Sequence, residues 1–475
     1  MTSPAVGTVW ETVVGLEVHC ELATDTKLFC GCRNVFGDEP NTNVCAVCLG
    51  LPGSLPVLNR RAVELAMRIG AALHCEVRPS LFHRKNYFYP DMPKDYQVSQ
   101  YDRPINVGGW LELADGTRIG VTRAHMEEDT GKTTHVGESG RVHGADHSLV
   151  DYNRAGVPLV EIVSEPDIRS AEAAKSYVNE LRAILFAIGA SDARMEEGSL
   201  RIDANISMRP AGEGDFGTRA EIKNLNSVRS LGRAVEYEMR RQVDLLEAGK
   251  RVEQETRHWD EDAGRTSSMR SKEEAFDYRY FPEPDLVLLD PDEHWQAEVK
   301  SALADLPSER RARLAELAQM TPSEVALVVD LDLDGLVMGA IENGADPRLA
   351  VNRAANEVAG HVGPRGLEQD AFTSVVKMEA DGSLTATQAK QVLAEILVEG
   401  GDPIAVAEAR GFEALDPDAL AGAVDAAIAE HPAEAARLRD GEDKLNGFFV
   451  GKVMAATGGK ADGKAVVALL RQRLS

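Results

Sequence analysis

Residues 199–208, SLRIDANISM, alternate apolar and polar side chains along their whole length. Leu200 and Ile202 fall on one side of this period of two, and Arg201 and Asp203 fall on the other. Because successive side chains of a strand point to opposite faces, the segment predicts a half-buried strand with a charged open face. The same alternation recurs in TVVGLEVHCEL (12–22), GVTRAHMEE (120–128) and TRAEIKN (218–224). Together these segments predict a sheet that is covered on one side.

Helical segments lie between these strands but do not alternate with them one for one. Asn59 is placed to cap a helix over 60–73, and Ser170 is placed to cap a second helix that ends before Gly189. The second helix carries its core stripe at Ala174, Val178, Leu181, Leu185 and Ile188. Without strict βαβ alternation, the pattern favours an α+β fold with a mixed or antiparallel sheet over a doubly wound one.

The periodicity becomes helical from about residue 294 and stays so to the end of the chain. A further break falls near Gly411, and Asp416 followed by Pro417 is a good N-cap and first helical residue. The sequence therefore predicts three domains: a sheet-containing domain at 1–293, a helical domain at 294–410 and a helical tail at 411–475.

Bulk composition is that of an ordinary globular protein. Hydrophobic residues make up 43% of the 475 positions and charged residues 27%. No apolar run reaches the roughly 20 residues of a membrane span, and the first residues lack the pattern of a signal peptide, so we expect a cytoplasmic protein.

The net charge of −25 disfavours nucleic acid as a partner, unless basic residues gather locally. They do so in residues 444–475, where six basic residues face one acidic residue, a local charge of +5. These residues are Lys444, Lys452, Lys460, Lys464, Arg471 and Arg473, against Asp462. This excess indicates an RNA-contacting tail, although a soluble helical tail with a few lysines explains it equally well.

Four cysteines, Cys30, Cys32, Cys45 and Cys48, form a C-x-C-x12-C-x2-C pattern. Two close thiolate pairs joined by a short loop are typical of a tetrahedral zinc site, and four sulfurs leave no position for a reacting water. We therefore predict a structural zinc site. The remaining cysteines, Cys20 and Cys75, are interpreted as core residues rather than as a nucleophile.

Acidic residues gather on the polar sides of the predicted strands. The residues concerned are Glu17 and His19; Arg201, Asp203 and Asn205; Arg219, Glu221 and Lys223; and Glu127, Glu128 and Asp129 near Lys132. Converging carboxylates repel one another unless a cation neutralises them, and Mg²⁺ is the natural candidate because it takes oxygen ligands and bridges to phosphates. The Gly131-Lys132-Thr133 sequence is not a P-loop, since Met126 stands where that motif requires glycine.

Ten segments in order resemble the B subunit of tRNA-dependent amidotransferases. They are GLEVHCEL (15–22), FGDEPNTNVC (36–45), LGLPGSLPVLN (49–59), RKNYFYPDMPKDYQ (84–97), HMEEDTGKTTH (125–135), NRAGVPLVEIVSEPDIRS (153–170), MEEGSLRIDANIS (195–207), AEIKNLNSVRSL (220–231), ETRHWDE (255–261) and DYRYFPEPDL (277–286). The likeness is dense over about 8–290 and looser afterwards, where GFFVGKVMAATGGKA (447–461) is similar to the family's tail.

The resemblance implies a cradle domain with a glutamine synthetase-like fold, followed by a helical domain and a tRNA-contacting tail. It implies ATP-dependent conversion of Glu-tRNA(Gln), Asp-tRNA(Asn) or both to the amidated forms, through phosphorylation of the side-chain carboxylate. Ammonia would come from glutamine through an amidase partner, the A subunit, with a small C subunit that completes a heterotrimer. The cysteine quartet is typical of the zinc-bearing members.

The same resemblance assigns the site residues. It places Glu17, His19, Glu128, Asp203 and Glu221 around magnesium, with Glu128 chosen over Glu127 on the resemblance alone. Lys132, Arg201 and Lys223 are the weaker candidates for contacts to the phosphates of ATP, with ordinary salt bridges as the alternative.

Two other classes of function compete with this interpretation. A non-catalytic zinc-containing scaffold that binds tRNA would not need carboxylates gathered beside lysines. A zinc hydrolase would need three protein ligands and an open position, which a four-sulfur site lacks.

Overall fold

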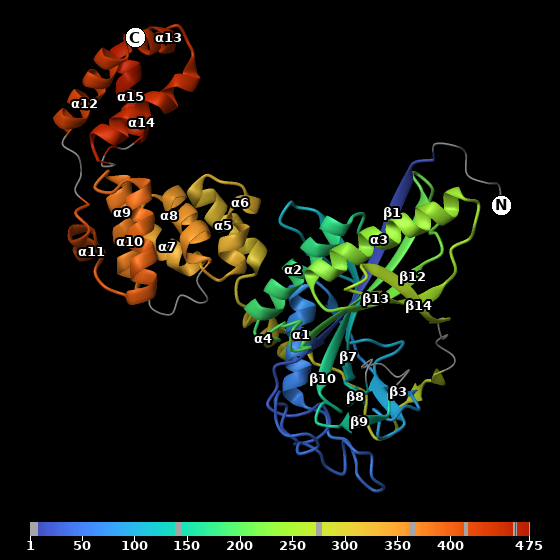
Figure 1. Cartoon of the computed structure of the whole chain (residues 1–475). Coiled ribbons are helices and arrows are strands. Elements are labelled where there is room, and N and C mark those ends of the chain that lie inside the picture. Colours follow the sequence, from blue (N-terminus) through green and yellow to red (C-terminus); the bar gives the residue numbers. More distant parts are fainter. Residues whose placement is uncertain are drawn as a thin grey trace. The chain divides into compact units, whose positions relative to one another are not determined.

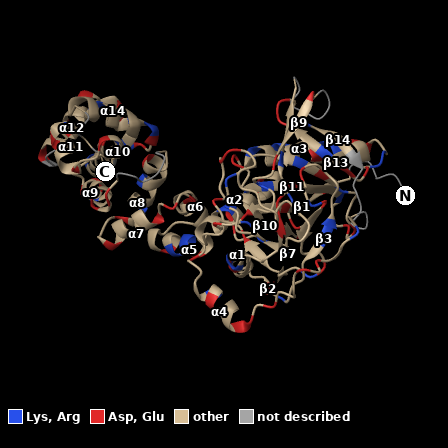
Figure 2. Cartoon of the chain, turned by 90° about the horizontal axis from the view of Figure 1, so that it is seen from below, with Lys and Arg blue, Asp and Glu red and all other residues tan. Residues whose placement is uncertain are grey.

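The computed structural model describes residues 8–137, 145–271, 278–360, 367–412, 417–458, 461 and 463–474. The chain divides into two compact units, Met1–Ser308 and Glu309–Ser475 (Figure 1). Lys and Arg are interspersed with Asp and Glu over both units (Figure 2). Among the described residues, no helix has the length and apolar character needed to span a membrane.

The first unit is built on a mixed sheet. Its main path runs β14-β13-β12-β11-β1-β10-β7-β4-β3-β15, and β2, β5 and β6 attach beside β7. Neighbours are antiparallel except for β12 and β13, which are parallel. The strands are β1 (Trp10–Glu21), β2 (Glu76–Val77), β3 (His83–Asn86), β4 (Tyr96–Ser99), β5 (Asn106–Val107), β6 (Trp110–Glu112), β7 (Arg118–Glu128), β10 (Pro158–Ser164), β11 (Leu200–Pro210), β12 (Ala220–Leu225), β13 (Glu255–Asp260), β14 (Arg265–Ser271) and β15 (Phe281–Pro282). A separate ribbon joins β8 (Lys132–Val136) to β9 (His147–Asp151).

Helices cover one face of this sheet. They are α1 (Arg60–Ala72), α2 (Ala171–Ala187), α3 (Val228–Glu247) and, packed on α1, α4 (Glu293–Ser301). Their apolar sides share one hydrophobic core with alternate residues of the central strands, such as Leu16 and Val18 of β1 and Ile202 of β11. Because alternate residues enter this core, the residues between them face the other side, where the sheet is open.

The caps that define α1 and α2 are the predicted ones. Asn59 accepts hydrogen bonds from the backbone N–H groups of Arg61 and Ala62, and Ser170 accepts one from Ala173. After α2 the chain turns at Gly189, whose φ of +64° lies in the region that glycine favours. The whole predicted stripe of α2, from Ala174 to Ile188, is buried.

The second unit is helical throughout its described residues and contains two separate hydrophobic clusters. The first cluster is formed by α5 (Pro307–Ala318), α6 (Pro322–Asp330), α7 (Asp334–Glu342), α8 (Pro347–Arg353), the π turn Ala354–Val358, α9 (Gln369–Ala380), α10 (Ala386–Glu399) and α11 (Pro403–Ala409). The second is formed by α12 (Pro417–Glu430), α13 (Pro432–Arg439), α14 (Asn446–Ala456) and α15 (Gly463–Leu474), with a 3-10 turn at Asp443–Leu445. The predicted cap Asp416 lies outside the described residues.

The predicted α+β class, with helical segments after the sheet, is confirmed. The finer division at residues 293 and 410 stays a prediction.

Candidate active site and metal centre

The open face of the sheet carries a band of charged side chains because of how β1 is paired. Strand β1 lies between β10 and β11, so that His19 stands opposite Glu161 on one side and Arg201 on the other. One step along the same face, Glu17 stands opposite Asp203. Strands that are far apart in sequence therefore bring acids and bases together on a single surface.

The tightest cluster on this surface joins His19, Glu127 and Glu161. The His19 Nε2 atom lies 3.3 Å from Glu161 Oε2 and 3.6 Å from Glu127 Oε1. One ligand atom from each residue lies within 4.8 Å of the other two. Octahedral Mg²⁺ with bonds of about 2.1 Å separates its ligand atoms by about 3.0 Å when adjacent and about 4.2 Å when opposite, so this donor set fits a magnesium ion.

The three members of the cluster change one another's pKa values, and the two glutamates shift in opposite directions. Burial raises the pKa of Glu127 to about 7, against the opposing effect of His19. Burial alone would lower the pKa of His19, but its hydrogen bond to Glu161 and the charges of Glu161 and Glu127 raise it to about 9. The charges of His125, His19 and Arg123 outweigh burial and lower the pKa of Glu161, so bases balance the charge of one carboxylate while burial disfavours ionisation of the other.

A second group of acids lies next to this cluster. Lys223 Nζ lies 2.6 Å from Asp203 Oδ2 and 3.5 Å from Glu221 Oε1, and Thr256 donates a hydrogen bond to Glu221. Burial, followed by the charges of Glu161, Glu221 and Asp203, raises the pKa of Glu17. One lysine thus does not neutralise the carboxylates around it.

His19, Glu127 and Glu161, with Asp203 and Lys223, line an open cavity of about 630 Å³, a size that suits a nucleotide or a comparable ligand. Its polar lining comes from several strands and the segments at their ends: His19, Lys85, Tyr87, Gln97, Glu127, Asp129, Thr130, Glu161, Arg201, Asp203, Lys223, Asn224, Asn226, His258 and Tyr278. The lining includes three cations, Lys85, Arg201 and Lys223, together with the acids Glu127, Asp129, Glu161 and Asp203.

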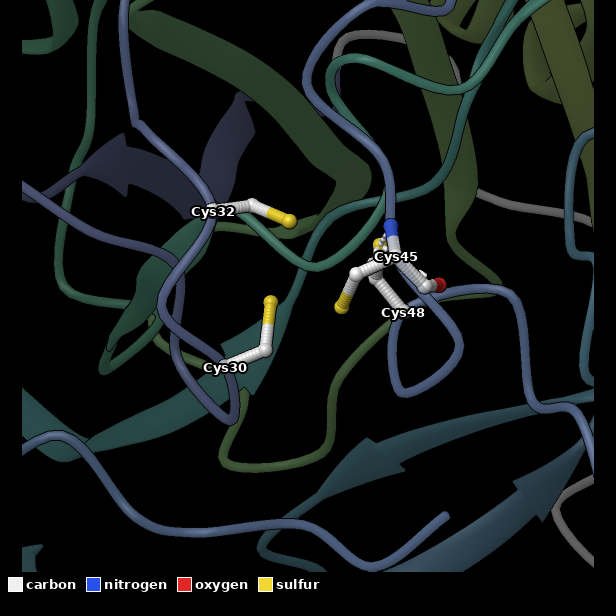
Figure 3. A group of neighbouring side chains, drawn as sticks. All are labelled: Cys30, Cys32, Cys45 and Cys48. Carbon is white, nitrogen blue, oxygen red and sulfur yellow. Dashed lines mark hydrogen bonds between the residues drawn. The ribbon is translucent and has the colours of Figure 1, made fainter.

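The four cysteines of the spaced pattern form a separate site. The sulfurs of Cys30, Cys32, Cys45 and Cys48 all lie within 4.8 Å of one another, and the side chains point toward a common centre (Figure 3). The Cys45 and Cys48 sulfurs are 3.9 Å apart. Tetrahedral zinc with bonds of about 2.3 Å separates its sulfurs by about 3.8 Å, so the quartet fits zinc.

The electrostatics around Cys48 favour the thiolate that a metal needs. The hydrogen bond from Cys30 comes first among the causes that lower the pKa of Cys48 to about 5, and the charge of Lys27 contributes. Lys27 is fully buried, and its amine donates to the carbonyl oxygens of Asn43 and Tyr152. A buried cation next to four sulfurs would offset the negative charge of a zinc–thiolate complex.

The other two cysteines are not arranged for nucleophilic chemistry. Cys20 is fully buried in the core of the first unit, and Cys75 packs against that core. Burial raises the pKa of both thiols to about 12, so neither forms a thiolate at neutral pH. Their interpretation as core residues is confirmed.

Comparison with known proteins decides the family. Residues 12–297 match the model of the GatB/GatE catalytic domain, and residues 336–474 match that of the GatB domain. The chain belongs to the GatB family. It is 50% identical to the B subunit of the aspartyl/glutamyl-tRNA(Asn/Gln) amidotransferase of Frankia casuarinae, covering 98% of this chain and 96% of that protein. It is 47% identical to the protein of the same name from Thermobifida fusca, over 98% and 94% of the two chains. For that of Synechocystis the identity is 44% over the full length of both.

Most of the predicted site residues of this GatB-family chain meet in the cavity or directly beside it. His19, Asp203, Arg201 and Lys223 line it. Glu17 and Glu221 do not line it, but Glu221 contacts Lys223, and the charges of Glu221 and Asp203 act on Glu17. Arg201 is bonded to Asp129 at 2.7 Å, so its contact in this structure is an ion pair.

Two predicted residues lie elsewhere. Glu128 points to the opposite side of β7 from Glu127, where it is bonded to Lys94 at 2.5 Å and accepts a hydrogen bond from Val98 N–H. It lines a cavity of about 110 Å³ next to Cys30 and Cys48. We therefore revise the magnesium candidate from Glu128 to Glu127. The side chain of Lys132 is exposed on β8 and is not among the residues that line the active-site cavity.

The most important residue that sequence reasoning missed is Glu161. It interrupts the apolar run PLVEIVS of β10, a pattern that also fits an ordinary surface glutamate on a strand. The signal that could have found it is a polar residue flanked by two apolar ones, since Glu161 stands between Val160 and Ile162, which are both fully buried. Glu17 likewise stands between two buried residues of β1. Lys85 of β3 was missed for a different reason, because it lies in a loop-rich segment without alternation.

Proposed function

We propose that this chain catalyses the ATP-dependent amidation step on Glu-tRNA(Gln), Asp-tRNA(Asn) or both. It would phosphorylate the side-chain carboxylate of the esterified amino acid and replace the phosphate with ammonia. The observation that carries the proposal is the cluster of His19, Glu127 and Glu161, with cations around it, on the open face of the sheet. Membership of the GatB family and the shared name of the relatives support it.

The chemistry needs a polarised phosphate and a positioned carboxylate more than a protein nucleophile. His19, Glu127 and Glu161 would hold magnesium, which supplies the positive charge that balances the phosphates of ATP. Lys85, Lys223 and Arg201 surround the same space and can contact the transferring phosphoryl group and the substrate carboxylate. Asp203 and Glu221 hold Lys223 in place by ion pairs, and Glu17 adds negative charge next to them that favours a bound cation.

Ammonia would reach this site from a partner. Each of the six cysteines either belongs to the quartet or has a thiol whose pKa is raised, so no cysteine is arranged to release ammonia from glutamine. The proposed source of ammonia is an amidase partner, the A subunit. The third member of the heterotrimer would be a small C subunit, with the whole complex working in the cytoplasm.

The charged tRNA would be held partly by the helical tail at 411–475. Lys444, Lys452, Arg471 and Arg473 are exposed on the second hydrophobic cluster of the second unit. Exposed cations on an acidic protein provide phosphate contacts that its mean charge does not.

The zinc quartet would have a structural role in this scheme. Its four sulfurs leave no position for water, which argues against a zinc hydrolase. A non-catalytic tRNA-binding scaffold also fits poorly, because a scaffold gains nothing from buried carboxylates whose pKa values are raised.

The test is to purify the assembled complex from cells and supply misacylated tRNA, glutamine and ATP. We expect amidated tRNA to form with release of ADP and phosphate, and both to require magnesium. A complex that binds the tRNA but consumes no ATP would refute the proposal in favour of a scaffold.

A further inference from the structure

A second hollow, of about 520 Å³, lies beside the active-site cavity. We call it the arginine groove and define it by Arg78, Tyr101, Arg103 and Arg123, which line it. These residues come from the connections after β2 and β4 and from β7. No residue of the zinc quartet and no predicted ligand of magnesium lines it.

The groove is joined to the active site at two points. Arg123 Nη2 lies 3.7 Å from Glu161 Oε1, and Glu161 also lines the active-site cavity. The Tyr101 ring stacks on Tyr280 with centroids 4.2 Å apart and planes at 10°. Tyr280 in turn lies close enough to Glu127 and Glu161 for their charges to add to the effect of burial in raising its pKa. A ligand in the groove therefore lies next to the reacting groups.

Two of the three arginines of the groove, Arg78 and Arg103, are available to a ligand, while Arg123 is paired with Glu161. Arg103 is exposed, and its side chain has no hydrogen bond or ion pair with any residue of the described ranges. Arg78 pairs with Glu76 at 2.5 Å, but both side chains are more than half exposed, and such pairs contribute little. The acid in the lining, Asp102, faces His83 at 3.4 Å. On a chain with a net charge of −25, this is a local concentration of positive charge.

An aromatic ring accompanies these cations. Tyr101 is 47% exposed while its stack on Tyr280 fixes its orientation, so part of the ring remains accessible. Proteins hold single-stranded nucleic acid by combining two kinds of contact. Arginines contact the phosphate backbone, and an aromatic ring in a fixed orientation stacks on a base. The rest of the lining, Pro79, Asp102, Pro104, Val107 and Thr122, adds one acid to the three arginines, so the groove keeps a net positive charge.

We propose that the arginine groove binds the unpaired 3′ end of the aminoacylated tRNA. Phosphates would lie against Arg103 and Arg123, and one base would stack on Tyr101. The amino acid esterified to the last nucleotide then extends past Glu161 into the active-site cavity. This inference rests on the proposed function and adds to it the surface that delivers the substrate.

The first test is a charge reversal, Arg103→Glu, in the assembled complex. The matched control is Arg240→Glu on α3, which changes the net charge equally at a side chain that is 75% exposed on the helix side of the sheet. The dissociation constant for misacylated tRNA is measured between about 50 and 200 mM salt. For Arg103→Glu we expect it to rise about tenfold or more at the lower salt, and the slope of log K against log salt to fall by about one. Arg240→Glu should match the unaltered complex.

The second test separates the ring from its hydroxyl group. Tyr101→Phe keeps the stacking surface, so binding should persist, whereas Tyr101→Ala should weaken it about fivefold to a hundredfold. Equal binding by the two variants would overturn the role of Tyr101.

Three results would refute the groove without refuting the proposed function. The unaltered complex could amidate its tRNA while Arg103→Glu leaves the dissociation constant and salt slope unchanged. Arg240→Glu could weaken binding as much as Arg103→Glu, which would show that the net charge of the chain, rather than a contact in the groove, decides the affinity. Arg103→Glu could dissociate the complex in gel filtration, which would make the groove a protein interface.

Discussion

Adjacent residues of β7, Glu127 and Glu128, give the sharpest test of the active site because they face opposite sides of the sheet. Glu127 contacts His19 at 3.6 Å in the active-site cavity. Glu128 is paired with Lys94 at 2.5 Å on the side of the zinc quartet. We expect the two glutamine variants to fail in different ways, although they remove the same charge one residue apart.

Glu127→Gln would remove a proposed magnesium ligand while changing the volume of the side chain little. Losing one electrostatic contact at a transferring phosphoryl group costs about 3 kcal/mol, so the rate of amidation should fall about a hundredfold. Stability should not fall. Burial raises the pKa of Glu127 to about 7, which means that its ionised form is disfavoured in the folded chain. The cost of ionising Glu127 in the folded chain is present above about pH 7 and vanishes as the pH falls to the pKa of the unfolded chain. At about pH 8 and without magnesium, the Glu127→Gln variant should therefore be no less stable than the unaltered protein.

Glu128→Gln should instead act on stability. The side chains of Lys94 and Glu128 are 9% and 3% exposed, so the variant leaves a buried ammonium group without its carboxylate. Breaking such a pair costs about 3 kcal/mol of unfolding free energy, even though the amide oxygen can still accept from Val98 N–H. The magnesium concentration that gives half-maximal activity should stay the same.

Two measurements separate these outcomes. Activity is titrated with magnesium, and urea unfolding is followed by tryptophan fluorescence, which reports on the first unit because Trp10, Trp110, Trp259 and Trp295 all lie within it. If Glu128→Gln raised the magnesium requirement while Glu127→Gln behaved like the unaltered protein, the assignment of the two faces would be refuted.

Three further predictions follow from the rest of the molecule. Asp203→Asn should keep the fold but lower the rate of amidation about a hundredfold at saturating tRNA, because Lys223 loses the carboxylate that it contacts at 2.6 Å beside the proposed phosphate site. Unchanged turnover would show that Asp203 has no role in the reaction. Cys45→Ser should abolish stoichiometric zinc and lower the midpoint of thermal unfolding, with Cys75→Ser as the control; protein purified without chelator that holds no zinc would end this prediction. Paired reversal of the exposed Lys444 and Lys452 to Glu should raise the KM for charged tRNA and flatten its salt dependence, and an unchanged salt slope would show that the tail does not contact the tRNA. Point variants are preferable here to truncation at residue 441, which would remove α14 and α15 from the core they share with α12 and α13.

Local signals in the sequence predicted much of this structure. The caps at Asn59 and Ser170 and the stripe of α2 depend on contacts within a few residues, and they are observed as predicted. Alternation likewise placed Glu17, His19 and Asp203 on an open face, because the period of a strand is a local property. The four-cysteine cluster was found from spacing alone.

What the sequence left open depends on pairing between distant strands. Alternation shows that Glu127 and Glu128 face opposite ways, but only the register of β7 on β10, which puts Glu161 opposite His125, shows which glutamate enters the cavity. The contact of His19 with Glu161 requires β1 to lie beside β10, a strand far away along the chain. Neither fact is encoded in a short window of sequence.

Adjacent residues of β3 and of β7 that face opposite sides of the sheet also limit how chains of this family can change in length. Lys85 lines the active-site cavity while its neighbour Arg84 lies on the other side, bonded to Glu283 at 2.6 Å, so β3 repeats the arrangement of Glu127 and Glu128 on β7. A substitution on either strand alters one side of the sheet. Insertion or deletion of a single residue would exchange the two sides for every residue beyond it, moving the ligands of one site into the wall of the other. We therefore expect homologous chains to vary in length at the turns that join β3 and β7 to their neighbours, and to keep the residue count within each of these strands.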